Sequence, residues 1–264
     1  MKRFGHLIII VMVFFACDKE NEEETIPSFD YGEVSDIDGN VYRTIQIGEQ
    51  TWIVDNLKTK HLNNGSEIIY VTVENRNAWD TLTSPACCWY DLTPKYADSL
   101  RNDGMFYNWY TVENNDVCPA GWRVPNDDDW IELFDYAETH GATDRKAAEK
   151  LKATEGWATS FNVGETLNGT NEFGFEAKGA GYYGKNQNGW WSQNAGNYAY
   201  WWSTDTTIVD EMLLADENLT IYDFANTFST GYVDDTRNTS KNVHKWYQGF
   251  NYKKNGYSIR CIKE

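Results

Sequence analysis

The sequence lacks the residue patterns that most metal centres and hydrolytic active sites require. Five cysteines and four histidines occur in 264 residues, and none forms the CxxC or mixed Cys/His spacing typical of structural zinc. There is also no HExxH motif, no glycine-rich phosphate loop and no Ser/His/Asp spacing. We therefore expect no metal, no cofactor and no enzymatic activity. Paired carboxylates among the many acids, as in a hydrolase acting on glycans, are the catalytic alternative.

Positive charge is scarce as well. The chain carries 23 Lys and Arg against 40 Asp and Glu, which gives a formal net charge of -17 at pH 7. A surface this negative repels the phosphates of nucleic acids and the headgroups of anionic lipids. Nucleic acid is therefore excluded as an expected partner.

Long apolar runs are missing except at the N-terminus. A basic pair precedes the apolar residues 7–15, which are fewer than the ~18 that a membrane-spanning helix needs, and Ala16 stands directly before Cys17. This order resembles the lipobox of bacterial lipoproteins, although Phe14 stands where that motif usually has leucine. We expect residues 1–17 to be a lipoprotein signal peptide with Cys17 as the lipid attachment site. An ordinary secretory signal is the alternative.

Residues 18–32 are acidic and contain few large apolar side chains, so we expect a flexible tether. The acids resemble the Lys-plus-acid export tag that some Bacteroidetes lipoproteins carry after the cysteine. This resemblance predicts an outer-membrane protein on the cell surface, which contacts the membrane through its N-terminal lipid anchor only. Residues 33–264 then form one folded domain.

The pattern of residues 34–57 is typical of an antiparallel hairpin. Apolar and polar side chains alternate on both sides of a turn at Gly39, a residue type that readily adopts positive φ. Asp36, Asp38 and Asn40 offer oxygen atoms at alternate positions, so a calcium loop is the alternative. Because Gly39 comes two places too early for an EF-hand loop, and the closing glutamate is missing, the turn is our preferred interpretation.

Helix signals concentrate after the segment CPAGWRVPNDDDW, residues 118–130. Pro125 disfavours helix for the residue before it, Asn126 is a good N-cap, and the following aspartates suit the positive end of the helix dipole. Apolar residues then recur at i, i+3, i+4 and i+7. We predict a helix over residues 126–137 and a shorter one over residues 144–154.

Other segments give weaker signals. CCWYD at 87–91 and GMFYNWYTV at 104–112 indicate short aromatic strands, and DFANTF at 223–228 gives one further helix signal. The chain beyond Trp157 is otherwise rich in glycine, asparagine and aromatic residues. These features predict the α+β class, with an N-terminal β-hairpin, two short helices and a loop-rich sheet.

Several separated segments in this order resemble the Fibrobacter succinogenes major paralogous domain, a family of exported bacterial proteins. They cover nearly all of the mature chain: 36–59, 104–112, 118–133, 150–157, 171–184, 200–205 and 256–264. GWRVPNDDDW and the terminal GYSIRC also resemble C-type-lectin-like domains of the formylglycine-generating-enzyme type. In that fold the first and last strands pair, so the resemblance implies a single C-type-lectin-like domain with a Cys118–Cys261 disulfide.

The sequence also departs from the relatives that this resemblance implies. The calcium-binding tripeptides of lectins are absent, and only Cys261 lies where the formylglycine-generating enzymes carry two cysteines. Where the family often shows a Pro-Gly-Gly-Tyr-Arg run, this chain has KGAGYYG. Calcium-dependent sugar binding and this type of catalysis are therefore not expected.

The remaining functional signal is a group of aromatic residues at 190–202. We interpret Trp201 and Trp202 as core residues, and we predict that Trp190, Trp191 and Tyr198 contribute to a ligand-binding surface. The expected function is that of a lipid-anchored binding module for a surface glycan or protein ligand. A structural cell-envelope lipoprotein is the alternative.

Overall fold

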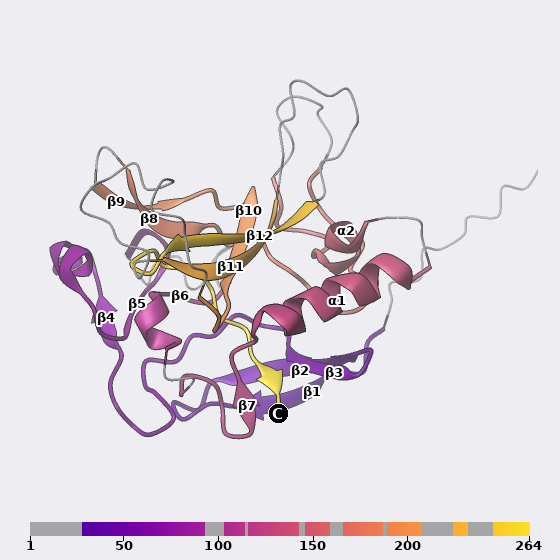
Figure 1. Cartoon of the computed structure of the whole chain (residues 1–264), viewed down its shortest axis with the longest axis horizontal. Helices are drawn as coiled ribbons and strands as arrows, with labels where there is room; N and C mark the ends of the chain where they lie inside the picture. The colour runs from indigo at the N-terminus through magenta and orange to yellow at the C-terminus, as the bar shows by residue number, and fades with distance from the viewer. Residues whose placement is uncertain are drawn as a thin grey trace, which may run out of the picture.

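The computed structural model describes residues 28–92, 103–113, 116–142, 146–158, 166–186, 189–206, 224–231 and 245–264. The predictions for the signal peptide, for Cys17 and for most of the tether lie outside the described residues. Within the described ranges, no helix is both long enough and apolar enough to cross a membrane. The fold is dominated by short sheets and loops, with a few short helices (Figure 1).

The largest sheet has five strands and joins both ends of the domain. Its order is β1-β2-β3-β13-β7, and every pairing in it is antiparallel. The last strand of the chain therefore lies in the interior of this sheet, between β3 and β7 (Figure 1). The strands are β1 (Gly32–Ser35), β2 (Val41–Ile47), β3 (Gln50–Ile53), β7 (Trp122–Arg123) and β13 (Ile262–Lys263).

Three smaller sheets complete the β-structure. One contains β10 (Tyr198–Trp202), β11 (Phe224–Gly231) and β12 (Lys245–Tyr252). A second contains β4 (Ile69–Val71), β5 (Ala86–Cys88) and β6 (Phe106–Tyr107). The third is a hairpin of β8 (Tyr182–Asn186) and β9 (Gly189–Gln193).

The main helix, α1 (Asp127–Thr139), confirms the prediction for this segment. Asn126 and Asp129 form a capping box, in which each side chain accepts a hydrogen bond from the backbone N–H of the other residue. The second helix, α2 (Ala147–Leu151), is shorter than predicted and ends at Lys152, whose backbone is extended. Short 3₁₀ helices are η1 (Arg76–Thr81), η2 (Tyr90–Leu92) and η4 (Trp109–Thr111).

The predicted N-terminal hairpin is also confirmed. The Asp36 carboxylate closes the turn because it accepts hydrogen bonds from the backbone N–H groups of Asp38 and Asn40 and from the hydroxyl of Tyr42. Gly39 adopts a φ of 77°, as the turn requires. These contacts explain the acidic turn without a metal ion.

Packed residues begin ahead of β1. Phe29 and Tyr31 pack against the core, and the Tyr31 hydroxyl donates a hydrogen bond of 3.0 Å to the carbonyl of Gly174. The part of the chain that packs against the core therefore begins before residue 33, where the sequence analysis predicted the start of the domain.

Two sequence-based assignments are wrong. The described part of the helix signal at 223–228, from Phe224 on, belongs to strand β11, which pairs with β10 on one side and β12 on the other. Its residues 224–230 are all buried, so neither face of the strand is exposed to solvent and its sequence shows no period-two alternation. In the predicted strand 104–112, only Phe106–Tyr107 is extended, and the Trp109–Thr111 part turns into η4.

One of the hydrophobic clusters of the core packs around α1. Trp130, Leu133 and Phe134 of this helix share one hydrophobic cluster with Trp52 of β3 and Trp201 of β10. The helix therefore joins the five-stranded sheet to the β10–β12 sheet, as Figure 1 shows. Trp201 and Trp202 are buried, as predicted.

The predicted disulfide is confirmed. Cys118 and Cys261 are bonded, with their Cα atoms 6.0 Å apart, and the bond ties the segment before β7 to the segment before β13. Cys87 and Cys88 are free and buried in β5. Burial raises the pKa of the Cys87 thiol to about 12, so this thiol stays protonated and unreactive at neutral pH.

Candidate functional site

The β8–β9 hairpin separates the two adjacent tryptophans that the sequence singled out. They lie in strand β9 rather than in a loop, and successive side chains of a strand point to opposite faces. Trp191 is 51% exposed. Trp190 is partly buried on the opposite face of the hairpin.

The contacts of Trp190 hold it against the domain. Its indole N–H donates a hydrogen bond of 3.1 Å to Asp80, and its ring stacks on Tyr183 with the centroids 5.8 Å apart. Burial acts to raise the pKa of Asp80, but hydrogen bonds from Lys185 and Trp190 lower it overall. The structure therefore gives Trp190 a packing role and does not bring it together with Trp191.

The strand register places other residues on the face of Trp191. Tyr182 pairs with Gln193, and Gly184 pairs with Trp191, so these four positions share one face of the hairpin. The Tyr182 hydroxyl donates a hydrogen bond of 3.3 Å to the side-chain oxygen of Gln193. The Tyr182 ring leans over Gly184, where an added Cβ would come within 2.5 Å of it.

Strand β10 continues this face. The rings of Tyr198 and Tyr200 stack with their centroids 5.8 Å apart, and the Tyr200 ring meets the Tyr182 ring edge-on at 5.2 Å. The buried Tyr257 lies 5.1 Å from Tyr200 and 5.6 Å from Tyr182, and it supports both rings. We name the aromatic surface as the set Tyr182, Trp191, Gln193, Tyr198 and Tyr200.

Gly181 brings the hairpin next to β10. Its N–H donates to the carbonyl of Tyr198 at 2.8 Å, and it forms a parallel bridge with Ala199. Gly181 has a φ of 75°, and an added Cβ would lie 2.1 Å from the carbonyl oxygen of Gln193. Only glycine permits this close approach.

The residues of the aromatic surface carry no formal charge. No charged residue occurs between Lys185 and Asp205, a stretch that supplies every member of the surface except Tyr182. Burial raises the pKa of the Tyr182 and Tyr200 hydroxyls, so both remain protonated at neutral pH. The surface therefore presents ring faces, hydroxyls and an amide without a formal charge.

Sequence reasoning found only part of this site. It identified Trp191 and Tyr198, but it did not select Tyr182, Gln193 or Tyr200. Two signals were available: the Asn188-Gly189 pair is typical of a hairpin turn, and the aromatic residues at 198, 200 and 202 alternate as in a strand. Applied together, they predict which rings share a face.

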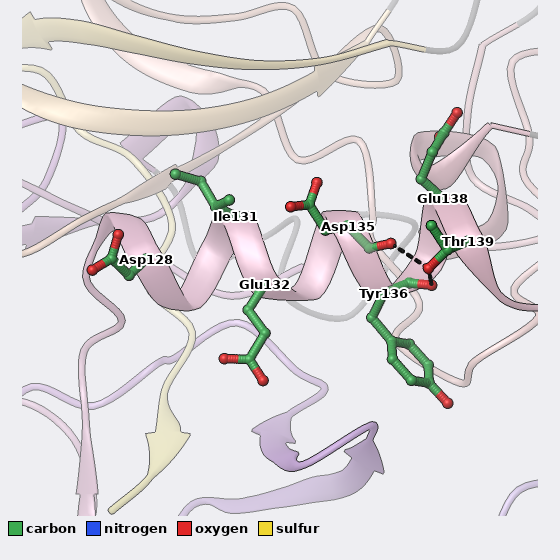
Figure 2. A pocket seen from close by; sticks show the side chains of 7 residues that line it. All are labelled: Asp128, Ile131, Glu132, Asp135, Tyr136, Glu138 and Thr139. Carbon is green, nitrogen blue, oxygen red and sulfur yellow. Dashed lines mark hydrogen bonds between the residues drawn. The ribbon is translucent and has the colours of Figure 1, made fainter.

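A second surface feature is a shallow depression along the outer side of α1. It is lined by Asp128, Ile131, Glu132, Asp135, Tyr136, Glu138 and Thr139. Figure 2 shows Glu132 and Tyr136 on one side of the helix and Asp135 and Glu138 on the other, so the acids do not converge. Glu138 is also paired with Lys146 at 2.8 Å.

The described residues contain no group of three or more His, Cys, Asp or Glu side chains that could hold a metal ion. The Asp38 carboxylate illustrates where such acids are used instead. It accepts hydrogen bonds from the Thr59 hydroxyl and the Lys60 N–H, and it lies 2.5 Å from the His61 ring. This carboxylate holds the turn against the segment that follows β3.

Comparison with known proteins identifies a family. The Fibrobacter succinogenes major domain matches residues 45–263. Neither a curated protein nor a solved structure matches the chain. The family match extends from β2 to β13 and includes every residue of the aromatic surface. The chain therefore belongs to the Fibrobacter succinogenes major domain family.

Proposed function

We propose that this protein is a lipid-anchored binding module of the cell surface, and that its ligand contacts the aromatic surface. The observation that carries the proposal is the exposure of Trp191 beside three half-buried tyrosines on one uncharged face. Contiguous exposed aromatic patches often mark binding sites, and aromatic residues dominate the energetics of many contacts.

The finer assignment of the fold to the C-type-lectin-like type belongs to this proposal. Two observations support it: the last strand lies in the same sheet as the first strands, and a disulfide joins the segment before β13 to the segment before the main helix. Because the calcium-binding tripeptides of lectins are absent, we propose binding that does not depend on calcium.

A structural envelope lipoprotein and a hydrolase acting on glycans are the competing functions. A hydrolase of this kind requires two carboxylates that face each other about 5–10 Å apart across a bound sugar. The acids along α1 point in different directions (Figure 2), which favours binding over hydrolysis at this depression.

The test is a substitution at the most exposed ring. We expect Trp191→Ala to weaken binding to a ligand found on a glycan and host-protein array by about tenfold or more, the equivalent of about 1.4 kcal/mol. Phe250→Ala is the matched control, because Phe250 is 42% exposed and lies on β12, outside the aromatic surface. Equal binding by the wild type and Trp191→Ala would show that the ligand does not bind at the aromatic surface.

Surface display needs a separate test. Protease added to intact cells should digest the protein although the cells are not lysed. A Cys17→Ala variant should lose the membrane association, because it has no thiol to acylate. Protection of the wild-type protein in intact cells would show that it faces the periplasm.

A further inference from the structure

We infer that the aromatic surface takes an uncharged glycan, a chain of neutral sugars held by ring stacking and amide hydrogen bonds. This inference rests on the proposed function and names the chemistry of its ligand. Three properties of the surface favour this ligand. Its rings are held in place by packing, amide groups lie beside them, and its residues carry no charge.

The rings are held in place before any ligand arrives. Tyr182 and Tyr200 rest on the buried Tyr257, and Tyr198 stacks on Tyr200. Held in this way, the rings lose little conformational freedom when a ligand binds. The carbon-bound hydrogens of a sugar form an apolar face, which packs well on an aromatic ring.

Amide groups surround the rings and have unused hydrogen-bonding capacity. Gln193 accepts from Tyr182 and donates to the carbonyl of Gly184 at 3.2 Å, which leaves one of its two N–H donors. Asn194 and Asn197 follow in the turn that leads to Tyr198. Their side-chain amides make no hydrogen bond within the described part of the chain. Amides donate and accept, as sugar hydroxyls do.

The distribution of charge argues against anionic ligands. The nearest charged residue in sequence, Lys185, lies on the opposite face of the hairpin, where it pairs with Asp80 at 3.1 Å. The stretch that supplies Trp191, Gln193, Tyr198 and Tyr200 therefore offers no cation to a carboxylate or sulfate. By strand register, Lys245 of β12 is two strands away from Tyr198. The net charge of -17 adds a long-range repulsion toward polyanions.

A protein ligand fits these observations less well. Protein interfaces combine aromatic anchors with arginine and with a polar rim that carries charges. The stretch between Lys185 and Asp205 contains no arginine and no other charged residue. Neutral hydroxyl-bearing ligands match such a surface in both charge and hydrogen bonding.

The experiment measures binding of the purified full-length protein in detergent to insoluble and soluble polysaccharides. The neutral set is cellulose, β-1,3-glucan, xylan, mannan and starch, and the anionic set is polygalacturonate and heparin. We expect at least one neutral polysaccharide to bind, with less than about a twofold change between low and high salt, because no counterions are released. Trp191→Ala and Tyr198→Ala should each weaken this binding about tenfold, and Phe250→Ala should leave it unchanged.

The other outcomes separate the two proposals. Salt-sensitive binding of the anionic set only, or capture of a protein ligand through Trp191 with no polysaccharide bound, would overturn the glycan inference and leave the binding module intact. Polysaccharide binding that survives both alanine substitutions would place the site elsewhere and overturn the inference. No binding to any polysaccharide or array protein would overturn both proposals.

Discussion

At Lys152 the fold encloses a lysine side chain completely and sets its ammonium group 3.9 Å from the centre of the Trp157 ring. Burial lowers the pKa of this lysine from 10.5 to about 7, and the nearby Glu149 opposes the shift. Between these two values the unfolded chain holds a proton that the folded chain has released. The free energy of unfolding therefore rises with pH across this window.

We predict that Lys152→Met removes this pH dependence. In the wild type, the lysine should contribute a rise on the order of 2 kcal/mol in the free energy of unfolding between pH 7 and pH 9. Urea unfolding at both pH values measures the difference between wild type and variant. Lys263→Met, which removes an exposed lysine, is the control. Equal pH slopes in all three proteins would contradict the prediction.

Arg260 is another buried cation, and neighbouring oxygens compensate its burial. Its guanidinium donates to Asn56 and to the carbonyls of Phe175 and Glu176. It also lies 4.2 Å from the centre of the Phe175 ring. The sequence did not predict the burial of Arg260 or Lys152, because their partners come from distant parts of the chain.

At the scale of the element, α1 depends on its N-terminal cap. Asn126→Ala removes the side-chain acceptor of the Asp129 N–H, and we expect it to lower the free energy of unfolding by about 1 kcal/mol. Asn126→Asp keeps an acceptor at the same position and should restore most of the loss. Equilibrium unfolding in urea tests both variants. An equal loss in the Asp and Ala variants would mean that the hydrogen bond from the Asp129 N–H to the side chain at 126 is not the source of the stabilisation.

The junction of β8 with β10 gives a second prediction for an element. Gly181→Ala should lower the free energy of unfolding by about 2 kcal/mol more than Gly39→Ala and should weaken ligand binding. Both glycines have nearly the same φ, 75° and 77°, but an added Cβ meets no atom within 4 Å at Gly39. The pair therefore separates the steric cost at the junction from the cost of the backbone conformation. Equal losses, measured by thermal unfolding, would refute the close-contact argument.

The elements that the sequence predicted correctly carry local signals. The turn at Gly39 and the cap at Asn126 are set by residues within a few positions of each other. Strand β11 has no such signal, because its burial on both faces comes from partners outside the strand. The same limit applies to the aromatic surface, since Tyr182 meets Tyr200 only through the junction at Gly181.

At the scale of the whole molecule, the disulfide closes most of the domain into one loop. Cys118 and Cys261 are separated by 143 residues, so the chain-entropy model gives a stabilisation of about 5 kcal/mol. We predict that the double variant Cys118→Ser, Cys261→Ser unfolds at much lower guanidinium concentration. Reductant should lower the wild-type midpoint and leave the double variant unchanged. A wild-type midpoint that is insensitive to reductant would contradict this prediction.

The position of Cys87 has a consequence for oxidative maturation. Its thiol is buried in the same hydrophobic cluster as Cys118 and Cys261, whereas Cys88 belongs to another cluster. Two pairs can form from the four cysteines after Cys17 in three ways. A nascent chain that oxidises before β13 has inserted between β3 and β7 is thus exposed to mispairing at Cys87. Native cross-linking then depends on the C-terminal strand docking first, or on a thiol exchange catalyst that reopens the wrong bonds.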